Sequence, residues 1–196
     1  MPRTAALKVD EIVEASMRHF WQNGYHATSM DVLVAAIGVS RHAIYTGIGG
    51  KNELYRLGFP AYQLAVVTPA FSVVEREGAG LAEVAQYFET QIAMAELVGL
   101  PGPGCLVANA MTETAPHDPD IAKEVSNHNE RLHKGFANAL FNEHPALTKD
   151  EVSALADFLL VTAQGLWSMS RSVPSAAPLR AHVATTLSLL RARLSQ

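Results

Sequence analysis

Apolar residues recur every three or four positions along nearly the whole chain, and this period decides the fold class. The clearest run lies in residues 8–22, where Ile12, Ser16 and Phe20 share one helical face. No segment alternates apolar and polar residues between turn signals, as a half-buried strand does. The sequence therefore predicts an all-α protein of about nine helices.

Glycines, prolines and capping residues set the expected ends of these helices. Thr28 is the expected cap of the second helix, with Asp31 three residues later completing a start similar to a capping box. Pro60 and Pro69 are expected to kink or split the fourth helix. The expected helices span 8–22, 28–38, 40–47, 51–76, 81–98, 105–115, 119–142, 149–171 and 179–194.

Composition excludes several classes of protein. With 48% hydrophobic residues the chain has ample apolar surface to fold, so a disordered protein is excluded. Cys105 is the single cysteine, which excludes a disulfide within the chain and fits a reducing compartment. The first residues lack the apolar core of a signal peptide, and no uncharged apolar run approaches the ~20 residues that span a bilayer. We expect a cytoplasmic protein without membrane contact.

Net charge is unevenly distributed along the chain. The formal value of −4 argues mildly against a nucleic-acid partner. Residues 1–57 nevertheless carry +1 and residues 58–196 carry −5. The first quarter is therefore electrostatically distinct, and the placement of its few bases matters more than their number.

Two short helices meet at Gly38-Val39-Ser40 and predict a helix-turn-helix. Glycine allows the backbone to leave helical geometry, and Ser40 is a good cap for the helix that follows. Leu33 and Ile44 are placed to be buried between the two helices. Such a second helix can enter the major groove of DNA with its first side chains facing base edges.

Several motifs at fixed spacing resemble the DNA-binding domain of the TetR/AcrR family of transcriptional repressors. They are Gly24-Tyr25-His26-Ala27-Thr28-Ser29-Met30, Gly38-Val39-Ser40-Arg41, Ile44-Tyr45 and Lys51-Asn52-Glu53-Leu54-Tyr55. The resemblance covers residues of about 8–57. It implies a three-helix DNA-binding domain in residues 1–50 and a helical ligand-binding and dimerisation domain in residues 51–196.

The resemblance also implies contacts with DNA. The residues that match contact positions or stand beside them are Thr28, Ser29, Ser40, Arg41, His42, Tyr45, Thr46 and Lys51. Thr28 and Ser29 would meet a phosphate at a helix N-terminus. The chain departs from the family at His42, Gly47 and Ile48, which puts the operator sequence in doubt.

The C-terminal domain of this family implies a small-molecule pocket and a dimer interface. Because charge is scarce on the middle helices, we expect an apolar or aromatic effector. The candidate pocket residues are Tyr62, Tyr87, Phe88, Met94, Cys105, Asn109, Met111 and Trp167. The candidate interface residues on the last two helices are Leu155, Leu159, Leu166, Val183, Leu187 and Leu190.

We interpret the chain as a homodimeric, ligand-responsive regulator, a repressor that a small molecule releases from a palindromic operator; activation remains open. Two alternatives stay open as well, a small-molecule binding protein with a degenerate DNA-binding head and an enzyme on a helical bundle. No phosphate loop, nucleophile elbow or HExxH motif supports an enzyme, and we expect no cofactor. The eight histidines, His128 and His133 among them, fit surface positions better than a metal site, and Cys105 fits a core or pocket wall better than a redox sensor.

Overall fold

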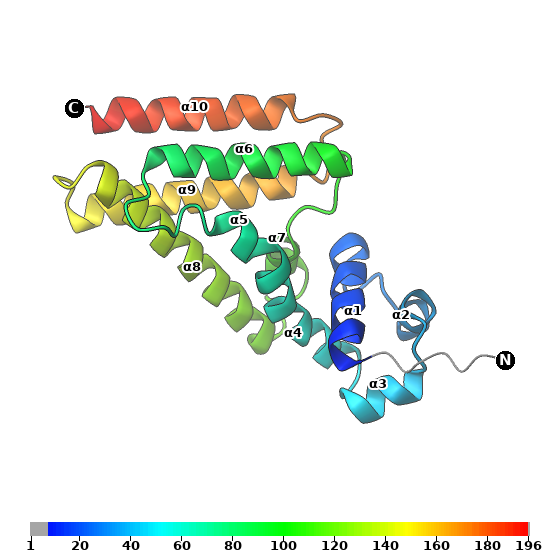
Figure 1. The fold of residues 1–196 in the computed structure, drawn as a ribbon. Coiled ribbons are helices and arrows are strands. Elements are labelled where there is room, and N and C mark those ends of the chain that lie inside the picture. The colour runs from blue at the N-terminus through cyan, green and yellow to red at the C-terminus, as the bar shows by residue number, and fades with distance from the viewer. Residues whose placement is uncertain (1–7, 196) are drawn as a thin grey trace.

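The computed structural model describes residues 8–195, and these residues form only helices and connecting turns (Figure 1). The expected fold class is confirmed. If the interrupted helix α4–η1–α5 is counted once, the described residues form nine helices. The elements are α1 Val9–Asn23, α2 Met30–Ile37, α3 Arg41–Gly47, α4 Lys51–Tyr62, η1 Gln63–Val67, α5 Thr68–Phe71, α6 Leu81–Val98, α7 Leu106–Glu113, α8 Pro119–Glu143, α9 Lys149–Met169 and α10 Ala177–Leu194.

The turn between α2 and α3 has the geometry that its sequence predicts. Gly38 adopts the left-handed conformation with φ of 70°, and the Ser40 hydroxyl accepts the backbone N–H of Ala43 at 3.2 Å. Leu33 and Ile44 are both fully buried between the helices. These contacts hold α3 at a fixed angle against α2 and leave the rest of its surface to solvent.

The long fourth helix is interrupted rather than broken. Pro60 lies inside α4, and Pro69 lies in the first turn of α5. Pro69 has no N–H to donate to the carbonyl four residues earlier, and the backbone widens into the π-helix η1 over Gln63–Val67. Gln63 is the first residue of η1.

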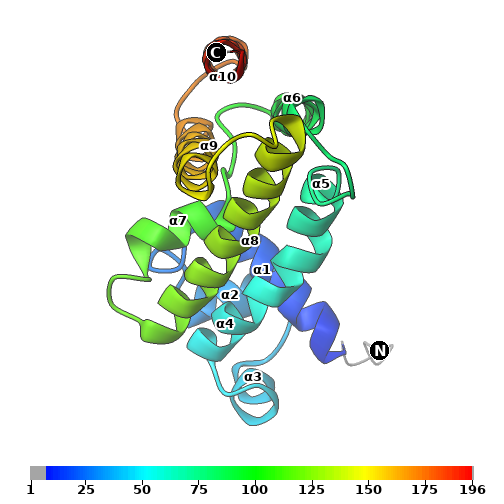
Figure 2. The ribbon, with the colours of Figure 1, turned by 90° about the vertical axis from the view of Figure 1, so that its left-hand side faces the viewer.

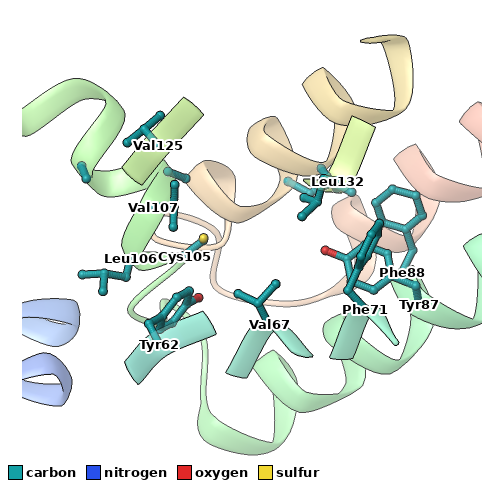
Figure 3. Packing of buried hydrophobic residues seen from close by; sticks show 14 of the residues in the cluster. Tyr62, Val67, Phe71, Tyr87, Phe88, Cys105, Leu106, Val107, Val125 and Leu132 are labelled. Carbon is teal, nitrogen blue, oxygen red and sulfur yellow. The ribbon is translucent and has the colours of Figure 1, made fainter. Parts of the chain in front are cut away.

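An aromatic cluster forms the core of the C-terminal helices. Phe71 meets Tyr87 edge to face with ring centroids 5.2 Å apart (Figure 3). It meets Phe136 in the same way at 5.2 Å, and Phe88 stacks on Phe136. Gly135 of α8 makes this packing possible, because a Cβ there would lie 2.5 Å from the Phe71 ring. The cluster joins α5, α6 and α8 into one packed layer.

Helices α9 and α10 lie at the far end of the molecule from α3 (Figures 1 and 2). Arg180 of α10 bonds Glu89 and Glu96 of α6, and Arg193 bonds Glu151 of α9. Helix α10 begins at Ala177, two residues earlier than expected, because Pro178 is well suited to the first turn of a helix.

Within the described residues, α9 is the one helix whose length and apolar composition would allow it to cross a membrane. In the fold it packs along α8, and 39% of its apolar window is buried. A core helix of a soluble protein meets the same criterion.

Candidate DNA-binding face and internal cavity

Helix α3 lies at one tip of the molecule (Figure 2). Ile44 is its one buried residue, and this single anchor orients the helix. The predicted contact residues Arg41, His42, Tyr45 and Thr46 are all exposed. Their spacing places them on neighbouring turns of one side, which is the arrangement that reading a major groove requires.

Arg41 is paired with an acid of the neighbouring helix. Its guanidinium donates to the Asp31 carboxylate at 2.6 Å, and both side chains are exposed. An exposed ion pair of this kind contributes only about 0–1 kcal/mol. Arg41 is therefore held in place yet available, and a phosphate or guanine that binds it competes with Asp31.

Two serine caps mark the N-termini of α2 and α3. The Ser29 hydroxyl accepts the N–H of Val32, and the Ser40 hydroxyl accepts that of Ala43. A hydroxyl that accepts one bond still carries a proton to donate. Both serines are exposed, so each can donate to a phosphate while it caps its helix.

The assignment of Thr28 requires a correction. Its side chain is fully buried, and its hydroxyl donates to the Gly24 carbonyl at 2.7 Å. Ser29 caps α2 in its place. Thr28 therefore closes the turn between α1 and α2, and its side chain does not reach a phosphate.

Tyr45 and Lys51 lie on either side of the glycine turn that ends α3. Gly50 has φ of 118°, and a Cβ there would lie 3.1 Å from the Tyr45 ring, so the ring packs on bare backbone. The Lys51 ammonium lies over the Tyr25 ring, 4.0 Å from its centroid, and partial burial lowers its pKa. Lys51 is therefore half-buried here, whereas Tyr45 is exposed.

A cavity of about 440 Å³ lies between η1, α6, α8 and the segment that leads into α7. This volume falls within the range of small-molecule sites. Five of the expected residues line it: Tyr62, Tyr87, Met94, Cys105 and Trp167. These five residues come from α4, α6, α9 and the segment before α7, which are distant in sequence.

Three expected pocket residues lie elsewhere. Phe88 is fully buried in the aromatic cluster, where it stacks on Phe136. Asn109 donates its amide to the Pro103 carbonyl at 3.0 Å, and Met111 packs against the core on another side of α7. Helical spacing alone predicted that these side chains are inside the protein, but not which cavity they face.

Cys105 lies at the N-terminus of α7, beside the Tyr62 hydroxyl (Figure 3). Burial raises the pKa of its thiol, although the backbone N–H of Ala108 acts in the opposite direction. Burial also raises the pKa of Tyr62. Both groups are therefore protonated at neutral pH, and the cavity wall here is uncharged.

The DNA-binding head, which consists of α1, α2 and α3, contacts the cavity through α1. Trp21 of α1 lines the cavity, and its indole N–H donates to the Gly104 carbonyl at 2.9 Å. At the other end of α7, the Glu113 carboxylate accepts the backbone N–H of His26 at 2.7 Å. Helix α7 therefore begins at the cavity and ends on the turn between α1 and α2.

Sequence reasoning missed Trp21 and His128 as cavity residues. His128 was expected at the surface but is 4% exposed and forms part of the cavity wall. Its position in the buried stripe of α8, between Val125 and Leu132, is the signal that could have placed it. Within residues 8–195, no three His, Cys, Asp or Glu side chains gather into a possible metal site.

The expected interface residues also require a correction. Leu159, Leu166, Val183, Leu187 and Leu190 are buried within the protomer, and Leu155 is half-buried. Another face of α9 is exposed and apolar instead. It consists of Ala154, Phe158, Val161, Gly165 and Met169, which recur at intervals of three or four residues.

Comparisons with known proteins agree with this geometry. Residues 12–56 match the family described as bacterial regulatory proteins, tetR family. These residues are therefore a DNA-binding domain similar to that of the tetR family, and the chain is a DNA-binding transcriptional regulator. It is 28% identical over 185 residues to the HTH-type transcriptional repressor ComR of Escherichia coli strain K12, covering 92% of this chain and 87% of ComR.

Two further likenesses extend over the whole chain. The uncharacterised HTH-type transcriptional regulator YezE of Bacillus subtilis strain 168 is 22% identical over 187 residues, covering 91% of this chain and 94% of YezE. A cysteine variant of the TetR family regulator CifR, solved with 26-bp operator DNA, superposes with a TM-score of 0.79 at 21% identity. That comparison covers 95% of this chain and 98% of CifR and shows a shared fold.

Proposed function

We propose that this protein is a homodimeric repressor that releases a palindromic operator when a small molecule enters the cavity. The observation that carries this proposal is Trp21, which belongs to the first helix of the DNA-binding head and is also a wall of the cavity. A ligand there touches the head itself. A repressor relative and a DNA-bound structural neighbour support the same interpretation.

In this proposal the N-terminal and C-terminal parts of the chain have different functions. Residues 1–50 bind DNA through Ser29, Ser40, Arg41, His42, Tyr45 and Thr46, and residues 51–196 form the cavity and the dimer. Two side chains act across this boundary, because Lys51 faces the DNA-binding head and Trp21 faces the cavity.

The dimer rests on the exposed face of α9. Phe158, Val161 and Met169 are large apolar side chains with exposed fractions of 42%, 70% and 51%. Helix α9, which carries them, lies far from α3 (Figure 1). A twofold contact through this face joins two heads that point the same way, as two half-sites of a palindrome require.

Release follows if the ligand favours a head position that does not fit the operator. A ligand shifts the equilibrium only through its different affinity for the two states. Filling the cavity displaces Trp21 or the start of α7, and Glu113 carries that movement to His26. We place the protein in the cytoplasm, where its operator is accessible.

A gel-shift titration with the DNA upstream of its own coding sequence tests the proposal. We expect specific binding to a palindrome that weakens steeply with salt. Arg41→Ala and Tyr45→Phe should weaken it, whereas Lys123→Ala, at an exposed position of α8, serves as a control. Absence of specific binding at low salt to every palindrome in that DNA would contradict the proposal and favour a binding protein with a degenerate head.

A further inference from the structure

The cavity wall carries no Asp, Glu, Lys or Arg side chain. An ionised ligand placed there would lose its hydration without gaining a counter-charge, which is unfavourable. The wall therefore selects uncharged molecules. Met94 and Val98 of α6 are exposed apolar residues of its lining, and they offer a neutral molecule a route from solvent.

Four aromatic rings line the cavity in two edge-to-face pairs. Trp21 meets Tyr62 with ring centroids 5.1 Å apart, and Tyr87 meets Trp167 at 6.3 Å. The two pairs come from α1, α4, α6 and α9. Because aromatic rings prefer offset and edge-to-face contacts with one another, these walls favour a flat aromatic ligand over a flexible aliphatic one.

A chain of hydrogen bonds leads from the surface to the one imidazole in the cavity wall. Arg131 donates through Nε and Nη2 to both oxygens of Glu75, each at 2.7 Å. Its Nη1 donates to the Gln63 amide oxygen at 3.3 Å. The Gln63 amide nitrogen then donates to Nδ1 of His128 at 2.8 Å.

This series of hydrogen bonds determines which ring nitrogen of His128 carries the proton. Arg131 has only donors, so the Gln63 oxygen faces it and the Gln63 NH₂ faces the imidazole. Nδ1 must accept, and the proton of the neutral ring is therefore on Nε2. Burial, and to a lesser extent the charge of Arg131, lower the pKa of His128 to about 4. Among residues 8–195, Nε2 bonds no protein group, and the ring is part of the cavity wall.

We propose that the cavity binds a neutral, flat aromatic molecule with a carbonyl or ether oxygen, and that the Nε2–H of His128 donates to this oxygen. The proposal rests on the small-molecule response inferred above and names the chemistry of its ligand. Gln63 acts as a positioning residue, since it sets the tautomer of His128 without touching the ligand. The Nε2–H, which bonds no group of residues 8–195, gains a hydrogen-bond acceptor from the ligand.

Three naphthalene probes of similar size test this chemistry on the full chain. The ketone 2-acetylnaphthalene offers an acceptor, 2-isopropenylnaphthalene replaces its C=O by C=CH₂, and 2-naphthoate carries a charge. Both tryptophans of the chain line the cavity, so quenching of their emission reports its occupancy, and calorimetry gives the affinity. We expect the ketone to bind about three- to tenfold more tightly than the hydrocarbon, and 2-naphthoate to bind most weakly.

Two variants assign the preference to named residues. His128→Phe should bind ketone and hydrocarbon equally, while its affinity for the hydrocarbon stays near that of the wild type. Gln63→Leu should also reduce the preference, and ¹H–¹⁵N spectra should show that His128 loses its uniform Nε2–H tautomer. A purely structural role for Gln63 would lower both affinities together and leave the tautomer unchanged.

Three results would overturn the proposal. The first is equal affinity of the wild type for the ketone and the hydrocarbon, and the second is a preference for the ketone that survives in His128→Phe. The third is that 2-naphthoate binds more tightly than the ketone, or that none of the three probes binds. Operator binding is measured separately. A ketone that occupies the cavity without weakening operator binding would sustain this inference and contradict the proposed ligand response.

Discussion

The Glu113 carboxylate accepts the backbone N–H of His26 at 2.7 Å, and this bond ties the end of α7 to the turn between α1 and α2. The backbone carbonyl of Glu113 also meets the His26 ring nitrogen Nε2 at 3.2 Å. The same helix begins at Cys105 in the cavity wall. One short, rigid element therefore has the cavity at one end and the DNA-binding head at the other.

Glu113→Ala should weaken communication between the cavity and DNA. The substitution removes the acceptor that ties α7 to the head, so the ratio of operator dissociation constants with and without 2-acetylnaphthalene should fall toward one. Coupling between sites is commonly about 5- to 150-fold, and we expect to lose most of it. Fluorescence anisotropy with labelled operator measures the ratio.

Glu113→Gln is the matched control, since its amide oxygen can still accept the His26 N–H. It should retain most of the wild-type ratio. If the Ala variant responds to the probe as the wild type does, the signal travels by another route, such as Trp21 alone.

Asp31 restrains the affinity of the head for DNA. Its carboxylate holds the Arg41 guanidinium and adds a negative charge close to where phosphates bind. Asp31→Asn should therefore tighten binding to any duplex about two- to fivefold at low salt, and Arg41→Ala should weaken it and reduce the salt slope by about one per protomer. Titrations at several salt concentrations measure both effects.

Glu77→Gln, in the exposed turn before α6, changes the net charge by the same amount and controls for overall charge. It should leave the affinity almost unchanged. Weaker binding by Asp31→Asn would show that the ion pair instead prepares Arg41 for its contact.

The sequence predicted the all-α fold because caps, glycines and prolines act locally. The expected and observed bounds of α6 agree at both ends, since Gly80 and Gly99 flank this helix. The prediction that Thr28 caps α2 was wrong, because Thr28 and Ser29 both carry a hydroxyl that can cap this helix. Thr28 is buried in the fold, and Ser29 caps α2.

The cavity and the exposed face of α9 could be predicted only in part. Helical spacing showed that Leu159 and Leu166 share an apolar face, but this face packs inside the protomer. Phe158 and Val161 lie on the other side of the same helix. Because α9 carries apolar residues on both sides, its sequence alone does not show which side is buried and which is exposed. His128 and Trp21 reach the cavity through tertiary packing that no local pattern records.

Val161→Arg should convert a dimer into a monomer. Val161 is 70% exposed at the middle of the apolar stripe on α9, and a charge there would be buried without a partner in a twofold contact. Sedimentation velocity or light scattering should show half the mass, with an unchanged circular dichroism spectrum. Operator affinity should fall by more than tenfold because the two heads are no longer linked.

Leu64→Arg is the control for this change, because Leu64 is as exposed as Val161 but lies on η1. It should leave the mass unchanged. A wild-type protein that is monomeric at all concentrations, or a Val161→Arg variant that remains dimeric, would place the interface on another face.

His128 should make the folded protein sensitive to acid. Its pKa is about 4 in the folded state and 6.5 when the side chain is free, so between these values the unfolded chain binds the extra proton. The free energy of unfolding therefore has its full His128 contribution above pH 6.5 and loses it as the pH falls toward 4. At about 1.4 kcal/mol per pH unit across this window, the loss reaches about 3 kcal/mol at most.

Urea unfolding of the wild type and His128→Phe, at one protein concentration and several pH values, measures this effect. The wild type should lose more stability than the variant between about pH 6.5 and about pH 5. His19, whose pKa is also lowered by burial, is present in both proteins and cancels in the difference. Parallel curves for the two proteins would mean that the folded state accepts the proton on His128, and that its imidazole is not the neutral donor that the bond to Gln63 requires.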